Sequence, residues 1–201
     1  MKSVYSKDVS KQSCPDGKYW ISPHERKRAD KSGKPYIQHV KGYCCCYHGP
    51  YQKIAEEENL PFDHLFFALT VYGEARGENA VSQKAIAWII RNRFNKKTFG
   101  DSYRNIVLKP LQFSCWSKSD KNYKMLQHPG KNGKSAHQKE ADKKAWRKCK
   151  NTLEEIFHAS ETENPLPGVY HYFSGPPKKR WQEKYFDLPN IPHFHFVKLG
   201  K

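Results

Sequence analysis

Apolar residues recur at helical spacing in three stretches of the chain, all of them after residue 60. The first stretch starts at Pro61, with Asp63 as its expected N-cap, and carries an apolar face as far as Tyr72. The second starts near Ser82, whose hydroxyl can cap it, and the third covers residues 135–159. Because apolar positions three and four residues apart share one side of a helix, the pattern predicts three packed helices.

The third predicted helix has an apolar face and a basic face. Its apolar stripe contains Ala141, Ala145, Cys149, Leu153, Ile156 and Phe157. Its basic face contains Lys139, Lys143, Lys144, Arg147 and Lys150. A surface helix buries one side and exposes the other, so we expect these basic residues to lie in solvent.

The first 50 residues have a different pattern, rich in turn formers and aromatic side chains. Short runs at Lys18–Ile21 and Pro35–Val40 are typical of strands, and the basic stretch Arg26–Lys34 between them predicts a turn. We therefore expect a small β-hairpin or an extended arm. Residues 50–60 follow as a bridge with one solvated helical turn at Glu56–Glu58.

Near the C-terminus, the aromatic stretches Val169–Phe173 and His193–Val197 predict short strands or extended loops. The patterns together predict a mainly α (α+β) fold. We expect two parts: a small, basic, cysteine- and aromatic-rich module over residues 1–55, and a helical domain over residues 56–201.

Charge adds a constraint on partners. The 36 Lys and Arg residues outnumber the 20 Asp and Glu residues and give a net charge of +16. Such a surface attracts polyanions, which include nucleic acid, anionic lipid and anionic wall polymers. The excess is densest in residues 118–150. A nucleic-acid-binding protein remains an alternative, although the chain contains no helix-turn-helix, zinc-finger or RNA-recognition motif.

The cysteines do not have the spacing of a metal site. Four of the six, Cys14 and Cys44–Cys46, lie near histidines in the first fifty residues, but no C-x2-C pair occurs. We therefore expect no metal, and nothing in the sequence indicates a cofactor. H-E-x-x-H is absent, and Cys115 is interpreted as a packing residue rather than as the partner of His171 in a cysteine peptidase.

The strongest chemical candidates are two glutamates that follow the first apolar helix. Burial at the end of that helix would disfavour the ionised form of Glu74, which suits a general acid. Glu78 lies beyond Gly77 and is expected to be more exposed, pairing with Arg76 or capping the next helix. Spacing alone leaves open that both are ordinary carboxylates at a helix end.

An ordered set of motifs extends this observation over residues 60–197. The chain resembles the SleB-like cell wall hydrolases, the spore cortex-lytic enzymes and related phage endolysins. The resemblance rests on Ala68–Glu78 (ALTVYGEARGE), Gln83, Ala87, Asn92-Arg93, Gln112–Trp116, the helix around Ala141–Leu153, Gly168–Phe173, Pro177 to Trp181 and Ile191–Phe196. The chain departs from the family at Phe173, where a second histidine is common.

The resemblance implies a lysozyme- or lytic-transglycosylase-like helical domain that cleaves the β-1,4 bond between N-acetylmuramic acid and N-acetylglucosamine in peptidoglycan. It assigns the role of catalytic acid to Glu74. A lytic transglycosylase needs one such acid, whereas a hydrolase usually needs a second carboxylate. Glu78, Asp101 and Asp120 are candidates for that second role, and none is compelling, so we favour the transglycosylase and keep the muramidase as the alternative.

Other side chains are candidates for binding the glycan, each with a core or framework role as its alternative. They are Glu78, Tyr72, Gln112, Ser114, Trp116, His171, Tyr172, Trp181 and His195.

The expected partners are peptidoglycan glycan strands and, through the basic surface, anionic wall or envelope polymers. The first residues lack the apolar core of a secretory signal, and no run approaches the roughly 18 apolar residues of a membrane span. We therefore expect synthesis in a host cytoplasm and action on the wall as a phage endolysin or a virion-associated lysin. An inactive structural component of a virion is a further alternative.

Overall fold

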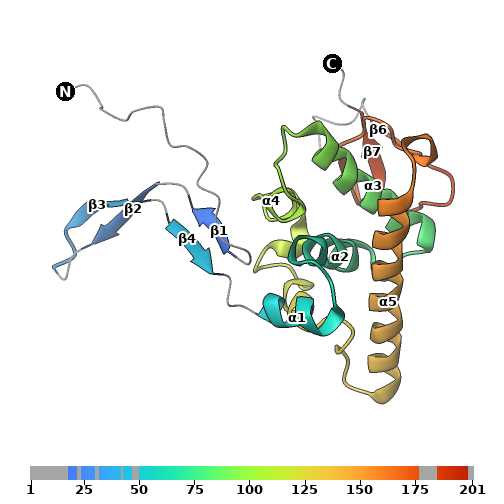
Figure 1. Cartoon of the computed structure of the whole chain (residues 1–201), viewed down its shortest axis with the longest axis horizontal. Coiled ribbons are helices and arrows are strands. Elements are labelled where there is room, and N and C mark those ends of the chain that lie inside the picture. The colour runs from blue at the N-terminus through green and yellow to red at the C-terminus, as the bar shows by residue number, and fades with distance from the viewer. Residues whose placement is uncertain are drawn as a thin grey trace. The chain divides into compact units, whose positions relative to one another are not determined.

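The computed structural model divides the chain into two compact units, residues 1–53 and residues 54–201 (Figure 1). The residues that it describes are 18–21, 24–29, 32–41, 43–46, 50–176 and 185–198. Cys14 and the side chains of Cys44–Cys46, considered above as metal ligands, lie outside this description.

The first unit contains two antiparallel strand pairs. Strand β1 (Lys18–Ile21) pairs with β4 (Tyr43–Cys46), and β2 (His24–Ala29) pairs with β3 (Pro35–Val40). Both predicted strands are confirmed, but their pairing with each other and the turn at Arg26–Lys34 are wrong. Residues 26–29 belong to β2, and β1 pairs with β4 instead of β3.

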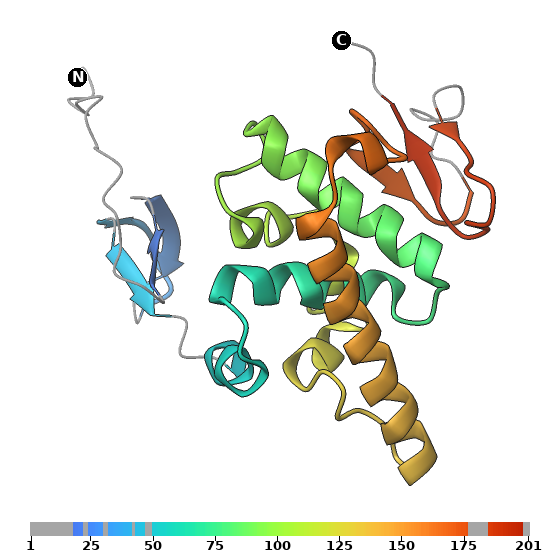
Figure 2. The same ribbon diagram turned by 45° about the vertical axis from the view of Figure 1, so that its right-hand side comes forward.

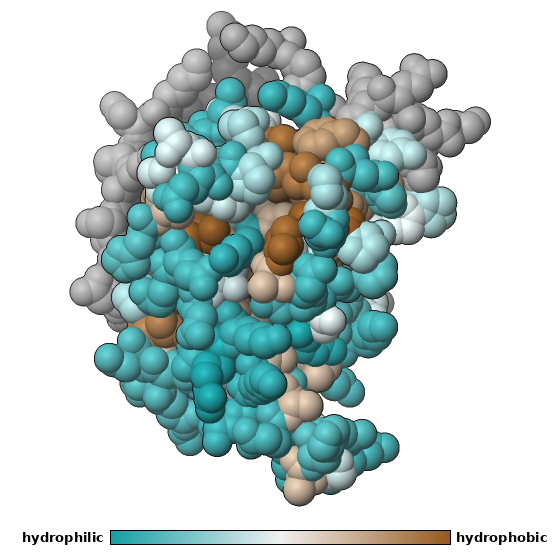
Figure 3. Space-filling model, turned by 90° about the vertical axis from the view of Figure 1, so that its right-hand side faces the viewer, coloured by the Kyte–Doolittle hydropathy of each residue, from teal (hydrophilic) through white to brown (hydrophobic). Residues whose placement is uncertain are grey.

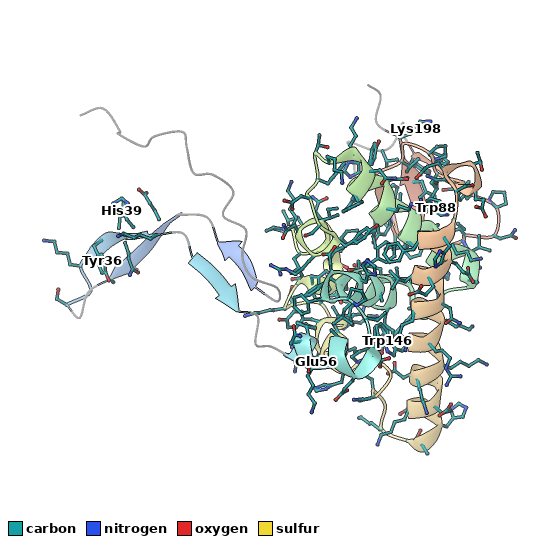
Figure 4. All side chains as sticks on the ribbon, in the orientation of Figure 1. Tyr36, His39, Glu56, Trp88, Trp146 and Lys198 are labelled. Carbon is teal, nitrogen blue, oxygen red and sulfur yellow. The ribbon has the colours of Figure 1, made fainter. Side chains whose placement is uncertain are left out.

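The physical reason for this error is that the residues whose burial is described in the pair β2–β3 are all exposed and show no alternating pattern. Every residue of β3 from Pro35 to His39 is exposed, as are Glu25 and Ala29 of β2. Tyr36 and His39 project from this hairpin (Figure 4). Strand pairs are recognised in sequence by apolar and polar alternation, and the described side chains of this pair give no such signal.

Residues 50–60, expected to be a bridge, contain a complete helix. Helix α1 (Pro50–Glu58) buries Tyr51, Ile54 and Ala55, which share one side of the helix. The run Glu56–Glu58 forms its last turn, so the solvated turn was correctly placed but the helix that precedes it was missed.

In the second unit, helix α2 is central. The helices of this unit are α2 (Phe62–Ala75), α3 (Ala80–Lys96), α4 (Tyr103–Val107) and α5 (Ala136–His158), with short 3-10 helices η1 (Ser114–Trp116), η2 (Tyr123–Gln127) and η3 (Glu161–Glu163). Helix α2 is contacted by five of these elements: α3, α4, α5, η1 and η2 (Figures 1 and 2). This enclosure explains why the sequence of α2 is almost continuously apolar.

The three predicted long helices are confirmed, but two of their predicted caps are wrong. Pro61 precedes α2 without a side-chain cap, and Asp63 instead accepts hydrogen bonds from the backbone N–H groups at the start of α4. Asn79 caps α3 by accepting from the N–H of Ser82. Asp63 therefore joins two helices, which a local capping rule cannot anticipate.

Helix α5 begins with a capping box formed by Ser135 and Gln138. Its predicted apolar stripe is shifted at the N-terminal end: Ala141 is exposed, whereas Asp142 and Trp146 are buried. The buried carboxylate of Asp142 accepts hydrogen bonds from Tyr72 and Asn132, which satisfy it. A polar residue in the core breaks the hydrophobic period, so the stripe was misplaced there.

A small antiparallel sheet completes the second unit, with the order β5–β7–β6. Its strands are β5 (His171–Phe173), β6 (Tyr185–Phe186) and β7 (His195–Val197), which confirms the two predicted extended segments. The unit is thus mainly helical with a small sheet, and its specific relation to the lysozyme fold stays a prediction. None of the helices in the described ranges combines the length and apolar character of a membrane span.

Candidate active site

Glu74 lies in the last turn of α2, at the place where this buried helix reaches the surface. Its neighbours Gly73 and Ala75 are buried, whereas the carboxylate side chain is partly exposed. The C-terminal end of α2 is held by the side-chain amide of Gln83, which donates to the carbonyl oxygens of Ala75 and Glu78. Helix α3 thereby fixes the turn that carries Glu74.

Two strong hydrogen bonds fix the carboxylate itself. The backbone N–H of Cys115 in η1 donates to Oε1 at 2.9 Å, and the hydroxyl of Tyr172 in β5 donates to Oε2 at 2.9 Å. The hydroxyl of Ser114 lies 3.5 Å from Oε1, which is long for a hydrogen bond. Each carboxylate oxygen therefore has its own donor, and the group is held in one orientation at the surface.

The two residues that supply these donors remain neutral. Burial, followed by the nearby charge of Glu74, raises the pKa of the Tyr172 hydroxyl well above its usual range. The same two causes raise the pKa of the Cys115 thiol. Tyr172 thus keeps its proton for the hydrogen bond, and Cys115 is a buried neutral thiol rather than a nucleophile.

The position of Cys115 depends on the absence of a side chain at Gly73. A Cβ atom at Gly73 would lie 2.6 Å from the Cβ of Cys115 and 2.8 Å from its Sγ. Glycine inside a helix costs about 0.5–1 kcal/mol relative to alanine. Gly73 therefore has a packing role, because it lets η1 approach α2 closely enough for the Cys115 N–H to reach Glu74.

Arg93 of α3 lies behind the site and contacts both segments that supply the donors. It is 2% exposed, and its Nε donates to the carbonyl oxygen of Tyr170 at 2.7 Å. Its guanidinium carbon lies 4.7 Å from the ring centre of Phe113. Phe113 directly precedes η1, and Tyr170 directly precedes β5, so one side chain supports both.

Arg93 also places a positive charge near Glu74. Burial lowers the pKa of Arg93 to about 10, while the nearby acidic groups of Tyr172 and Glu74 act in the opposite direction. Since about 10 is well above neutral pH, the guanidinium stays charged. A charged guanidinium therefore lies near both Tyr172 and Glu74.

The residue before it, Asn92, anchors the chain that leads into β5. Its Nδ2 donates to the carbonyl oxygens of Leu166 and Val169 at 2.7 and 2.9 Å, and its Oδ1 accepts from Asn164. The motif includes the pair Asn92-Arg93 but does not indicate what either side chain contacts. Polar residues on the buried side of an apolar helix were the available signal.

A groove of about 820 Å³ lies beside Glu74. Its lining consists of Leu108, Lys109, Pro110, Leu111, Phe113, Ser114, Trp116, Ser117, Ser119 and Asp120. Ser114 both lines the groove and faces Glu74. The mixture of apolar and hydroxyl-bearing walls suits a sugar, which presents apolar faces and polar edges.

Several predicted binding residues meet at this place, and they come from distant parts of the sequence. Ser114 and Trp116 line the groove, and Tyr172 binds Glu74 directly. The indole N–H of Trp116 donates to Thr70 at 2.9 Å, which fixes the ring at the groove wall. Gln112 precedes these residues, and its buried Oε1 accepts no hydrogen bond from a described residue.

Tyr72 is not at the surface, contrary to its predicted role in binding substrate. Its side chain is fully buried, its hydroxyl donates to Asp142 at 2.5 Å, and Asn132 donates to the same hydroxyl. Tyr72 lies two residues before Glu74 and therefore on another side of α2. It belongs to the core.

Two other predicted residues, Glu78 and His195, form their described contacts with residues other than Glu74. Glu78 pairs with His193 at 2.8 Å instead of with Arg76, which donates to Asn122. His195 contacts Asp187 at 2.5 Å.

The order of residues in β5 separates two further candidates. His171 packs against Phe99, and strand alternation places it on the opposite face of β5 from Tyr172. Tyr172, rather than His171, therefore reaches the acid. Trp181 lies outside the described residues. Within the described ranges no cluster of three His, Cys, Asp or Glu side chains has the arrangement of a metal site.

Comparison with known proteins agrees with the motifs. The chain is similar to the spore cortex-lytic enzymes of Halalkalibacterium halodurans (46% identity over 53 residues) and Bacillus subtilis (44% over 53 residues). Each match covers 26% of this chain, and only 16% and 17% of the respective relative. No solved structure matches the chain.

The sequence pattern of one protein family covers more than half of the chain. It is the family described as Cell Wall Hydrolase, and it matches residues 77–197. The match includes Arg93, Cys115 and Tyr172 and starts three residues after Glu74. This chain therefore belongs to the Cell Wall Hydrolase family.

Proposed function

We propose that this protein degrades peptidoglycan by cleaving the β-1,4 bond between N-acetylmuramic acid and N-acetylglucosamine, with Glu74 as the general acid. The observation that carries the proposal is a single one: a partly exposed carboxylate at the edge of a groove, with one fixed donor on each oxygen. Membership of the Cell Wall Hydrolase family supports the choice of substrate.

In the first step, protonated Glu74 gives its proton to the glycosidic oxygen as the bond to the anomeric carbon breaks. The sugar passes through an oxocarbenium-like transition state, and Glu74 becomes a carboxylate. The Cys115 N–H and the Tyr172 hydroxyl then stabilise the new negative charge, because hydrogen bonds to a charged acceptor are stronger than those to a neutral one.

In the second step, we propose that the same carboxylate acts as a base and the enzyme is a lytic transglycosylase. Glu74 takes the proton from the C6 hydroxyl of the muramic acid residue, whose oxygen forms a bond to the anomeric carbon and closes an anhydro ring. Glu74 is then protonated again. Two other candidate carboxylates are already engaged, Glu78 by His193 and Asp101 by Asn105, which supports a mechanism with one acid.

A muramidase with the same substrate is the second candidate, and one observation favours it. Asp120 lines the same groove as Ser114 and is partly exposed. One of its oxygens accepts from the N–H of Asn122 at 2.7 Å. In a hydrolase, Asp120 would activate the water that attacks the anomeric carbon.

Mass spectrometry of a peptidoglycan digest tests both steps. We expect soluble fragments with anhydromuramic ends from the purified protein and from Asp120→Asn. Fragments with reducing muramic ends, lost in Asp120→Asn, would favour the muramidase. A digest that releases no fragment would contradict the proposed activity.

The proposal implies peptidoglycan glycan strands as substrate and anionic wall or envelope polymers as partners of the basic surface. The setting stays a prediction: a phage endolysin or a virion-associated lysin that reaches the wall from a host cytoplasm. Expression of the chain in bacterial cytoplasm tests it, with lysis expected only when a membrane-permeabilising protein is co-expressed. Lysis without that protein would contradict this setting.

A further inference from the structure

Helix α5 carries a group of basic side chains without carboxylate partners. We call Lys139, Lys143, Lys144, Arg147 and Lys148 the basic ridge; all five are exposed. Within the described ranges, none of them forms an ion pair. Nearby lysines differ in this respect, since Lys131 pairs with Glu57 and Lys150 pairs with Glu58.

The spacing of the ridge works against the stability of its own helix. Lys139, Lys143 and Arg147 form two like-charged pairs four residues apart, and Lys144 and Lys148 form a third. Like charges at this spacing destabilise a helix. Lys139, the first residue of the ridge, also lies at the end of the first turn of α5, where the helix dipole favours acidic rather than basic side chains.

Packing does not explain the ridge either. Residues 136–141, the first turn and a half of α5, are all exposed, so this end of the helix stands free of the core. Figure 3 shows mostly hydrophilic residues, with a few pale brown ones, at the lower end of the face in view. Of the four acidic residues of α5, Glu154 and Glu155 lie at its other end, where Glu155 pairs with Lys84. The other two lie close to the ridge in sequence: Asp142 is buried and bonded to Tyr72 and Asn132, and Glu140 forms no ion pair within the described ranges.

We propose that the basic ridge binds a phosphodiester-linked polymer of the bacterial cell wall. Residues four apart on a helix are about 6 Å from each other, so the ridge presents cations in rows to a flexible chain of phosphates. Arg147 adds a planar donor group suited to phosphate. The identification of the wall as the source rests on the proposed function.

Single-stranded nucleic acid fits this surface less well. Proteins that bind it combine basic side chains with exposed aromatic rings on which bases stack. The exposed large apolar residues of the described chain are Tyr36, Ile37, Val81, Leu111 and Tyr185. None of them lies on α5, so the ridge offers charge without a stacking platform.

Sedimentation with purified insoluble walls of a Gram-positive bacterium tests the proposal. The full chain carries Glu74→Gln throughout, so that the walls stay intact. We expect Lys143→Glu with Arg147→Glu to weaken wall binding roughly tenfold at low salt, with a smaller effect as salt rises. Removal of the phosphodiester polymers by hydrofluoric acid should reduce binding of the parent protein to the level of this variant.

Lys96→Glu with Lys198→Glu is the matched control, because both residues are exposed and the net charge falls by the same four units. We expect it to retain most of the binding. Equal losses in the two variants would show that only net charge matters and would overturn the proposal. Full binding to stripped walls, or tighter binding to single-stranded DNA than to walls at equal salt, would also overturn it.

The variants separate this proposal from the proposed activity. With Glu74 restored, the ridge variant should cleave short soluble glycan fragments at the wild-type rate, since these lack the phosphodiester polymer. Ridge-dependent wall binding by a protein that cleaves no glycan would contradict only the activity. Thermal unfolding checks the fold, and the ridge variant should melt close to the wild type. Both positions are exposed, the pair 139/143 becomes an opposite-charge pair, and the pair 143/147 stays a like-charge pair.

Discussion

At the scale of the residue, the central feature is a carboxylate whose two oxygens have different donors. Glu74 Oε1 accepts from the backbone of Cys115, and Oε2 accepts from Tyr172, which lies 98 positions further along the chain. Neither contact follows from a local pattern. The motif around Glu74 indicates which residue is the acid. It does not indicate the donor from Cys115, because a backbone N–H is present at almost any residue. Whether His171 or Tyr172 faces the acid depends on the alternation of side chains along β5.

Tyr172→Phe removes the donor to Oε2 and keeps the ring in place. We expect kcat on peptidoglycan fragments to fall roughly 10- to 100-fold, since a hydrogen bond to a charged group contributes about 1.5–3 kcal/mol. Ser114→Ala removes the longer 3.5 Å contact and should lower kcat less than about threefold, with its main effect on KM through the groove. Equal losses of kcat in both variants would contradict this ranking.

Arg93 is a positioning residue, and its effect should appear in turnover. Arg93→Met removes the Nε donor to the carbonyl oxygen of Tyr170 and the guanidinium group against the ring of Phe113. Because these residues precede the two segments that supply the donors to Glu74, we expect kcat on peptidoglycan fragments to fall roughly tenfold. Steady-state rates measure this.

Arg91→Met is the control for Arg93, because both arginines belong to α3. Arg91 donates to the carbonyl oxygens of Ile156 and Ala159 at the end of α5. Its loss should lower thermal stability and leave kcat near that of the wild type. Equal losses of kcat in both variants would show that the effect is a general structural one.

At the scale of the element, the spacing of apolar residues correctly predicted those helices that have one continuous buried side. Helices α2, α3 and α5 are of this kind, and their packing around α2 brings η1 and β5 to the end of that helix. The hydrophobic period did not predict the structure where a buried residue is polar or where residues are exposed. Asp142 interrupts the apolar stripe of α5, and Asp63 caps a neighbouring helix. In β2 and β3, the residues whose burial is described are exposed.

Gly73 tests whether the approach of η1 to α2 matters for activity. Gly73→Ala places a methyl group against Cys115, and we expect a loss of about 1–3 kcal/mol in the free energy of unfolding. We also expect lower kcat, since the Cys115 N–H moves away from Glu74. Chemical denaturation and turnover measurements report the two effects separately.

Gly77→Ala is the matched substitution four residues later, where an added Cβ would meet no atom within 4 Å. It should change the free energy of unfolding by less than about 0.5 kcal/mol and leave kcat near that of the wild type. If both glycine variants lose activity equally, the close contact between Gly73 and Cys115 is not what positions the donor.

At the scale of the whole molecule, we propose separate roles for the net charge of +16 and for Glu74. The excess of basic residues is densest in residues 118–150, which include the basic ridge, whereas the carboxylate of Glu74 is held at the end of α2 beside a groove. Composition predicted a polyanion as a partner but did not indicate which surface would bind it or which residue would react, and both assignments stay proposals.

The most direct test of the account is release of soluble muropeptides from purified peptidoglycan by Glu74→Gln. The substitution keeps the size of the side chain and the acceptor oxygen but removes the transferable proton. We expect an unchanged melting temperature and a rate lowered roughly 100- to 10,000-fold, whereas Glu154→Gln on the exposed side of α5 should retain full activity. A folded Glu74→Gln protein that releases muropeptides at the wild-type rate would contradict the assignment of Glu74 as the acid.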